Sequence, residues 1–86
     1  MIDETRACKM CGTINDLEVH HCIHGTATRK RADEDGLTVY LCHRDHERLH
    51  RDRMVDLAFI QFAQRHYELT IGSREDFIAR YGKSWL

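Results

Sequence analysis

Histidines and cysteines crowd into the sequence between Cys8 and His50, and these are the residue types that bind transition metals. Six of the seven histidines in the chain lie between His20 and His50. Neutral imidazole is an uncommon core residue but the commonest metal ligand, so packing alone explains this crowding poorly. We therefore expect metal chemistry in this stretch.

The four cysteines favour a metal site over disulfides. Cys8 and Cys11 form a C-x-x-C pair before Gly12, a turn in which two thiolates converge on one ion. No signal-peptide pattern is evident, and no apolar run approaches the roughly 20 residues that span a bilayer. We therefore expect a cytoplasmic protein with no membrane contact, in which thiols stay reduced and act as ligands.

Two short strands and a long connection are expected around the histidine doublet. Residues 17–22 alternate apolar and polar side chains, which predicts a first strand. By composition, residues 23–35 predict a loop that contains His24, here taken as a loop residue and not as a ligand. Gly36 marks a turn into a second strand, 37–41, which is rich in β-branched and aromatic residues.

Three helices are expected after the second strand. In the first, from Cys42 to about Arg53, the i, i+4 spacing places Cys42, His46 and His50 on one face. The second, residues 54–69, is the expected core helix, with an apolar stripe formed by Val55, Ala58, Phe59, Phe62, His66 and Leu69 and widened by Leu57, Ile60, Ala63 and Tyr67. A capping box from Ser73 to Asp76 opens the third, and Trp85 is expected to fold back onto the core.

Charge and length limit the classes of function. The chain has 86 residues, 31% of them charged, and a formal net charge of −1. A domain this small often needs a metal or disulfide staple, and any contact with nucleic acid must come from a local basic patch. The candidates for that patch are Arg29, Lys30, Arg31, Arg51 and Arg53. The alternative is a solvated loop whose charges are neutralised by the acidic residues 33–35.

The motifs together resemble the HNH, or ββα-metal, nuclease superfamily. The resemblance rests on C-x-x-C-G from Cys8, on L-E-V-H-H ending at His21, on G-L-T-V-Y-L-C from Gly36, and on the helical His46 and His50. It is greatest to the small phage-encoded members, among them the domain of the RecA-dependent recombination-enhancement nuclease. It implies one small α+β domain over residues 1–86, with a loose tail at 1–7. After the tail, the resemblance implies a treble-clef-like zinc knuckle with the ββα core at 8–53, and then two C-terminal helices at 54–86.

The resemblance also implies a mechanism. Members of this family are endonucleases that hydrolyse DNA phosphodiester bonds and leave a 5′-phosphate on the product. His21 would be the general base, and His20, His46 and His50 would hold a catalytic divalent ion. That ion would be zinc, nickel, manganese or magnesium, although imidazoles favour the first three. Because strand neighbours point to opposite faces, one site for His20 and His21 implies a bulged strand end.

Two departures from the family pattern affect these assignments. Zinc-stapled members use C-x-x-C twice, whereas Asp45 stands where the last cysteine would be, so we assign a structural zinc to Cys8, Cys11, Cys42 and Asp45. His46, His43 and Cys22 remain alternatives for the fourth ligand. The asparagine that braces the loop in the family is absent, since Gly36 and Leu37 occupy its place and Asn15 lies too early; Thr38 is a candidate replacement.

Two functions follow as hypotheses. The first is a phage-encoded, metal-dependent DNA endonuclease that acts in recombination or genome processing in the host cytoplasm. The second is a catalytically inactive, zinc-stapled module that binds DNA or protein, for example as an inhibitor of a host defence or recombination protein. The sequence predicts neither strand or sequence specificity nor an oligomeric state.

Overall fold

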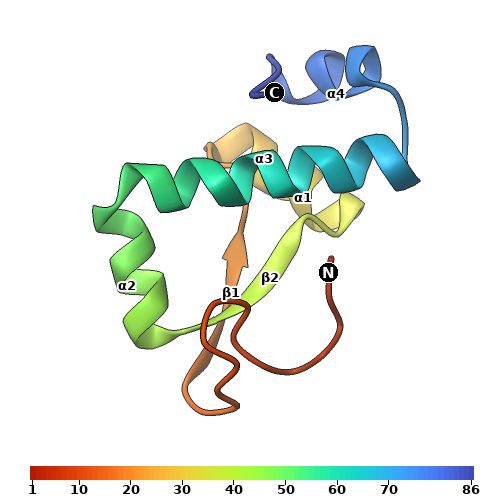
Figure 1. The fold of residues 1–86 in the computed structure, drawn as a ribbon. Helices are drawn as coiled ribbons and strands as arrows, with labels where there is room; N and C mark the ends of the chain where they lie inside the picture. Colours follow the sequence, from red (N-terminus) through yellow and green to blue (C-terminus); the bar gives the residue numbers. More distant parts are fainter.

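An antiparallel two-stranded hairpin and four helices make up residues 1–86 in the computed structural model (Figure 1). Strand β1, Leu17–His21, pairs with β2, Thr38–Cys42, in a register that joins Leu17 to Cys42 and His21 to Thr38. The small α+β fold is therefore confirmed. The expected bulge is wrong, because the register is regular through His21 and the Cys22 N–H still donates to the Leu37 carbonyl at 3.1 Å.

A helix occupies most of the connection that was expected to be a loop. Helix α1 spans Thr26–Asp35, and Ala32 is its one buried residue. With so little apolar surface the segment lacks the periodic pattern by which a helix is recognised in sequence. Gly36 ends α1 in the left-handed conformation (φ 69°), and a Cβ added there would lie 2.8 Å from the Met1 nitrogen.

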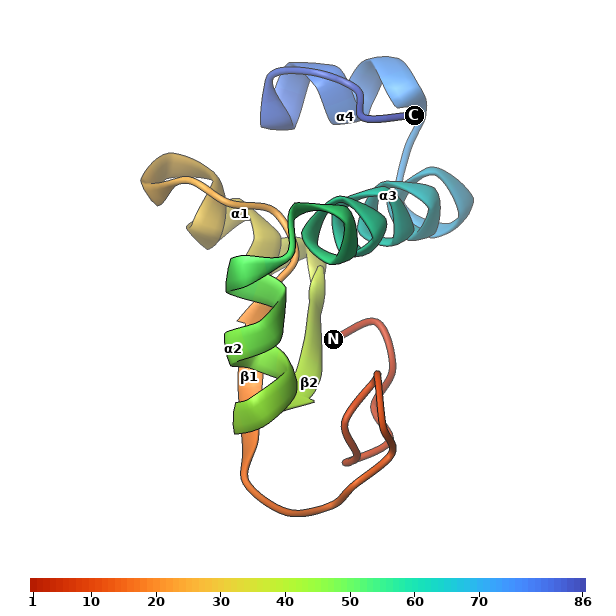
Figure 2. The ribbon, with the colours of Figure 1, turned by 60° about the vertical axis from the view of Figure 1, so that its left-hand side comes forward.

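Two consecutive helices cover the hairpin. Helix α2, His43–Arg51, packs along both strands, and α3, Arg53–Thr70, follows with a change of direction (Figure 2). The change occurs at Asp52, whose carboxylate accepts hydrogen bonds from the N–H groups of Met54 and Val55 at 3.0 and 3.3 Å. Asp52 therefore follows the last residue of α2 and caps the N-terminus of α3.

The buried face of α3 matches the widened part of the expected stripe, with Gln64 as an addition that was not expected. Its buried residues are Ile60, Ala63, Gln64 and Tyr67, whereas Ala58 and Leu69 are exposed. The face is determined by what packs on it: Tyr67 contacts Phe77 of the C-terminal helix α4, Arg74–Tyr81, with ring centroids 5.3 Å apart. The sequence contained enough apolar residues on neighbouring faces to make the rotation of the helix ambiguous.

The C-terminal segment closes the core from the other side of α3. Helix α4, Arg74–Tyr81, begins with the predicted capping box, in which Ser73 and Asp76 exchange backbone-to-side-chain hydrogen bonds. Trp85 returns to the core as predicted: its ring centroid lies 6.1 Å from that of Phe77, and its backbone N–H donates to Gln64 Oε1 at 2.8 Å. Thus α3 is held between the hairpin and α4.

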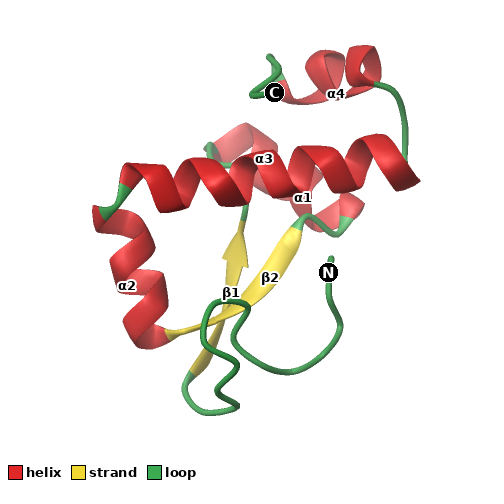
Figure 3. Ribbon diagram, viewed as in Figure 1, coloured by secondary structure: helices red, strands yellow, loops and turns green.

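The N-terminal segment lies beside β2 and forms the long loop in Figure 3. The Ile2 N–H donates to the Thr38 carbonyl at 3.0 Å, and the Lys9 N–H donates to the Tyr40 carbonyl at 2.9 Å. These bonds place the cysteine pair next to the end of the hairpin. No helix in the structure combines the length and the apolar character that a membrane crossing would require.

Candidate metal centres and a histidine pocket

The cysteine group lies where the N-terminal loop meets the start of α2. Gly12, with φ 79°, closes a turn in which its N–H donates to the Cys8 carbonyl at 2.9 Å. This turn places Cys8 and Cys11 together. Cys42 ends β2, and Asp45 lies three residues later in the first turn of α2. Two chain segments therefore contribute two donors each.

The four donor side chains converge. Asp45 Oδ2 accepts from the thiols of Cys8 and Cys42 at 3.2 and 3.3 Å, and the sulfurs of Cys11 and Cys42 are 3.8 Å apart. All four donor atoms lie within 4.8 Å of one another, and every cysteine is free. Hydrogen bonds from Cys11 and Cys8 lower the pKa of Asp45, so its carboxylate stays charged. This group can bind a metal ion.

The alternatives for the fourth donor lie elsewhere. His46 and His43 both donate to the Glu18 carboxylate, at 2.8 and 3.0 Å, and the ring nitrogens of neither are grouped with the cysteine sulfurs. Cys22 is fully buried, and burial raises the pKa of its thiol to about 12. The structure thus groups Asp45, and none of these three, with the cysteine trio.

A pocket of about 430 Å³ opens beside the end of β1. Five histidines border it, from β1, from the loop that follows, and from α2: His20, His21, His24, His46 and His50. Arg29 of α1 also lines it. Imidazole rings from three separate segments therefore face one solvent-accessible space, together with a guanidinium group that can contact an anion.

His20 is linked through His46 to a carboxylate. His46 Nδ1 donates to Glu18 at 2.8 Å, which leaves its Nε2 as an acceptor 3.2 Å from His20 Nδ1. The other nitrogen of His20, Nε2, is buried without a hydrogen-bond partner. Burial, together with the neighbouring His46 and His24, lowers the pKa of His20 to about 4. His20 is therefore neutral at pH 7, which is the form that binds metals.

The predicted triad of His20, His46 and His50 is brought together in part. The ring of His50 lies 4.8 Å from that of His46 and 6.2 Å from that of His20, centroid to centroid. His50 is exposed and borders the pocket, while His20 and His46 are in direct contact.

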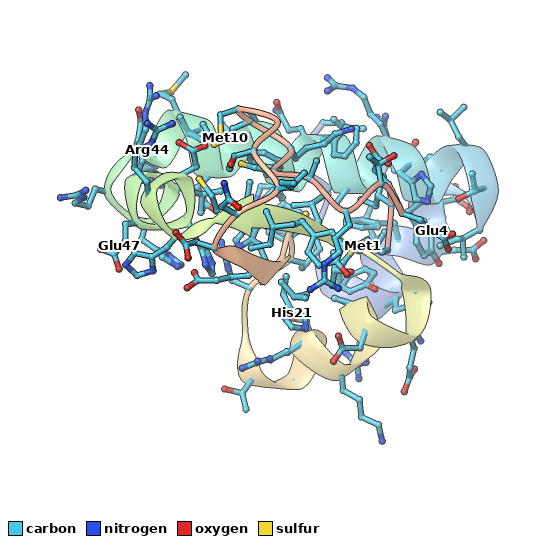
Figure 4. The ribbon with its side chains drawn as sticks, turned by 90° about the horizontal axis from the view of Figure 1, so that it is seen from below. Met1, Glu4, Met10, His21, Arg44 and Glu47 are labelled. Carbon is cyan, nitrogen blue, oxygen red and sulfur yellow. The ribbon has the colours of Figure 1, made fainter.

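His21 points to the other side of the strand from His20. Its Nε2 donates to Asp33 of α1 at 2.6 Å, and Figure 4 shows it on the side that α1 covers. Both rings nevertheless border the pocket, because it opens at the end of the strand. The Asp33 contact depends on α1, and the loop predicted for residues 23–35 implies no such contact.

A second carboxylate reaches the pocket from α3. Asp56 Oδ1 accepts from His24 Nε2 at 2.6 Å, and a ring nitrogen of His20 lies within 4.8 Å of both donor atoms. His24 was expected to be an ordinary loop residue, and Asp56 was not singled out. Their 32-residue separation left no local spacing by which this pair could have been found.

The basic residues of the candidate DNA patch are dispersed. Arg29 faces the pocket, whereas Arg31 donates to the Arg80 carbonyl at 3.0 Å. The remaining three are exposed: Lys30 on α1, Arg51 at the end of α2 and Arg53 at the start of α3.

The acidic residues after the basic run have other partners. Asp33 accepts from His21, and Arg80 donates to Asp35 and Glu34 at 2.6 and 2.8 Å. The acids that could have neutralised the basic run therefore bind elsewhere.

Comparison of the chain with protein-family models, with curated proteins and with solved structures finds no match. The interpretation of the site therefore rests on its residues and their geometry.

Proposed function

We propose that the protein is a metal-dependent endonuclease that hydrolyses DNA phosphodiester bonds in the manner of the HNH superfamily. One observation carries the proposal: a contacting pair, His20 and His46, and a carboxylate-bound histidine, His21, border the same pocket. Hydrolysis of a phosphodiester requires a base for the attacking water and a cation beside the phosphate. The pocket provides residues suited to both needs.

His21 is the base in this proposal. The Asp33 carboxylate accepts the proton on Nε2, which leaves the lone pair of Nδ1 available to a water molecule. The water gives its proton to Nδ1 as its oxygen attacks phosphorus, and the 3′ oxygen leaves. The product then carries a 5′-phosphate. Asp33 holds the ring in the required tautomer and stabilises the imidazolium that forms.

His20 is the anchor for the divalent ion. Its unpartnered Nε2 and its neutral state fit a metal ligand. The family resemblance would add His46 and His50 as further ligands, although in this structure His46 contacts the other ring nitrogen of His20, Nδ1, at 3.2 Å. When bound, such an ion stabilises the charge that develops on the phosphate and on the leaving oxygen. Arg29 would bind a non-bridging phosphate oxygen, because its side chain lines the same pocket.

The cysteine group is proposed to hold a structural zinc ion. Three sulfurs and one carboxylate oxygen make a four-donor set that suits tetrahedral zinc and leaves no open position for catalysis. Its position, between the N-terminal loop and α2, would fix the helix that carries His46 and His50.

Thr28 is proposed to replace the bracing asparagine of the family. Its hydroxyl lies 2.5 Å from the His24 carbonyl and 3.1 Å from the Gly25 carbonyl, so it can hold the loop that follows β1. Thr38, the replacement expected from the sequence, instead lies within β2, where its carbonyl accepts from Ile2.

A plasmid-nicking assay tests the proposed function. The zinc-loaded protein is incubated with supercoiled DNA and with Mn²⁺, Mg²⁺, Ni²⁺ or excess chelator, and the ends of the product are analysed. We expect metal-dependent nicks with 5′-phosphate ends. Absence of cleavage with every metal would overturn the proposal.

The second candidate function is a zinc-stapled binding module without catalysis, such as an inhibitor of a host protein. The observation that favours it is the orientation of His20 and His21 on opposite faces of β1, each with a partner of its own. A protein that binds DNA tightly in the same assay but never cuts it would fit this candidate.

A further inference from the structure

The loop after β1 and the first turns of α3 bring three metal-binding side chains together. His24 comes from the loop, Asp56 from α3 and His20 from the strand, and their donor atoms lie within 4.8 Å of one another. His24 and Asp56 are in direct contact at 2.6 Å. The two ring nitrogens of His20 have different roles, because Nδ1 contacts His46 and Nε2 has no hydrogen-bond partner.

The hydrogen bonds determine which nitrogen of His20 is available. Glu18 accepts from His46 Nδ1, so His46 Nε2 accepts from His20 Nδ1–H. The proton of a neutral His20 therefore sits on Nδ1, and the lone pair sits on Nε2. That atom is the one buried side-chain nitrogen or oxygen in the structure that lacks a hydrogen-bond partner.

We propose that His20, through Nε2, binds a divalent transition-metal ion together with His24 and Asp56. His46 then acts as a positioning residue that orients His20 and fixes its tautomer, as carboxylates and carbonyls commonly do for metal-bound histidines. An ion pair between His24 and Asp56 alone would leave the buried Nε2 without any partner. A metal ion satisfies all three side chains at once.

Two imidazoles and one carboxylate leave coordination positions open. This donor set suits Mn²⁺, Fe²⁺, Co²⁺, Ni²⁺ or Zn²⁺ more than Mg²⁺, which prefers oxygen ligands. His20 and His24 line the pocket, and Arg29 lines it too, so the open positions face a space in which a phosphate oxygen can bind.

The inference rests on the proposed function and keeps its pocket ion, but it replaces the ligand set that the resemblance implies: His50 is omitted and His46 lies outside the coordination shell. It does not depend on cleavage, since ion binding is measured separately. Substitutions of Asp56 and of His50 distinguish the two ligand sets, because Asp56 belongs only to the set with His24 and His50 belongs only to the set with His46.

Co²⁺ titration of the protein loaded with one equivalent of zinc tests the inference, because excess zinc would also fill the pocket. Zinc first fills the cysteine group, so that absence of sulfur-to-cobalt charge-transfer bands confirms that added Co²⁺ binds nitrogen and oxygen donors. The wild type is expected to bind one Co²⁺. Loss of an outer partner alone weakens metal sites roughly 10–100-fold. We therefore expect D56N and H24Q to weaken binding at least about a hundredfold, and H50Q to change it less than about threefold.

Matched variants keep the test independent of folding. H66Q changes a histidine on α3 far along the chain from Asp56 and should bind Co²⁺ like the wild type, and far-UV circular dichroism should be the same for all variants. Weak binding by H50Q with normal binding by D56N would overturn the inference in favour of the other ligand set. No Co²⁺ binding by the folded wild type would also overturn it, while nicking activity would still decide the proposed function.

Discussion

Carboxylates on neighbouring elements determine the tautomers of two histidines of the pocket. Glu18 fixes the tautomer of His46, and Asp33 fixes that of His21. Both are contacts between residues far apart in the chain, at separations of 28 and 12 residues. Sequence spacing predicts which residues are neighbours within a helix or strand. It therefore predicted which histidines lie close together, but not the acidic residues that orient them.

The cysteine group is the opposite case. Its members follow from local spacing together with the family resemblance: a C-x-x-C turn, a cysteine at the end of a strand, and an aspartate three residues later, where zinc-stapled members have a cysteine. Each of these patterns spans only a few residues, and the hairpin brings the two halves together. The grouping of Cys8, Cys11, Cys42 and Asp45 was therefore predictable from the sequence.

Replacement of Asp33 by asparagine tests its role as the positioning residue for His21. An amide donates as well as accepts, so it can hold the ring in the wrong tautomer. We expect kcat for nicking to fall by roughly 10²- to 10⁴-fold, the range of a general base, with KM nearly unchanged. The conservative variant D33E should recover part of kcat. Equal loss in D33N and D33E, with a raised KM, would indicate a structural role only.

The buried His20 predicts how the metal-free protein responds to acid. Its pKa is lowered from 6.5 to about 4 on folding, so between these values the unfolded chain binds a proton that the folded chain does not. Stability should be full above about pH 6.5 and should fall as the pH drops towards 4, by at most on the order of 3 kcal/mol. Urea unfolding in chelator at several pH values measures this.

Two variants isolate the contribution of His20 to this pH dependence. H20Q should lose most of the acid sensitivity between pH 6.5 and 4, whereas H66Q should keep it. Parallel pH curves for the wild type and H20Q would contradict the assignment.

At the scale of elements, the strands and the helices α2, α3 and α4 were predictable because each has a periodic pattern or a cap. Helix α1 was not. It buries only Ala32 and is defined by its ends, with Gly25 before it and Gly36 after it. A glycine before a strand can end either a helix or a loop. The sequence around Gly36 therefore does not distinguish the two.

The capping box of α4 gives a test at this scale. The Ser73 hydroxyl accepts from the Asp76 N–H at 3.1 Å, and S73A removes that acceptor. We expect the free energy of unfolding to fall by about 1 kcal/mol, with the metal content unchanged. T70A is the matched control, since the Thr70 hydroxyl only bonds the His66 carbonyl of its own helix, and it should change stability by less than about 0.5 kcal/mol. Equal effects of the two variants would contradict the cap assignment.

At the scale of the whole molecule, 86 residues enclose one core of 14 buried residues, and the cysteine group joins the N-terminal loop to that core. Cys8 and Cys42 are themselves members of the core. A metal ion that binds the folded state stabilises it by mass action, and small domains often depend on such an ion.

Removal of the proposed structural metal should therefore lower the free energy of unfolding strongly. We expect a chelator to lower the melting temperature, and D45N to weaken zinc binding by at least about tenfold while D16N, an exposed aspartate near the same loop, leaves it unchanged. Calorimetry and metal analysis measure both. Normal zinc content in D45N together with a loss in H46Q would assign the fourth ligand to His46 instead.

In the proposed mechanism, His21 activates water beside a metal-binding histidine pocket. The most direct test of this mechanism is single-turnover cleavage of a defined DNA duplex by zinc-loaded wild type, H21A and H66A, each with saturating Mn²⁺ and with equal Co²⁺ affinity verified beforehand. The account predicts that H66A cuts at the wild-type rate and that H21A is slower by roughly 10²- to 10⁴-fold. Cleavage by H21A at the wild-type rate would contradict it.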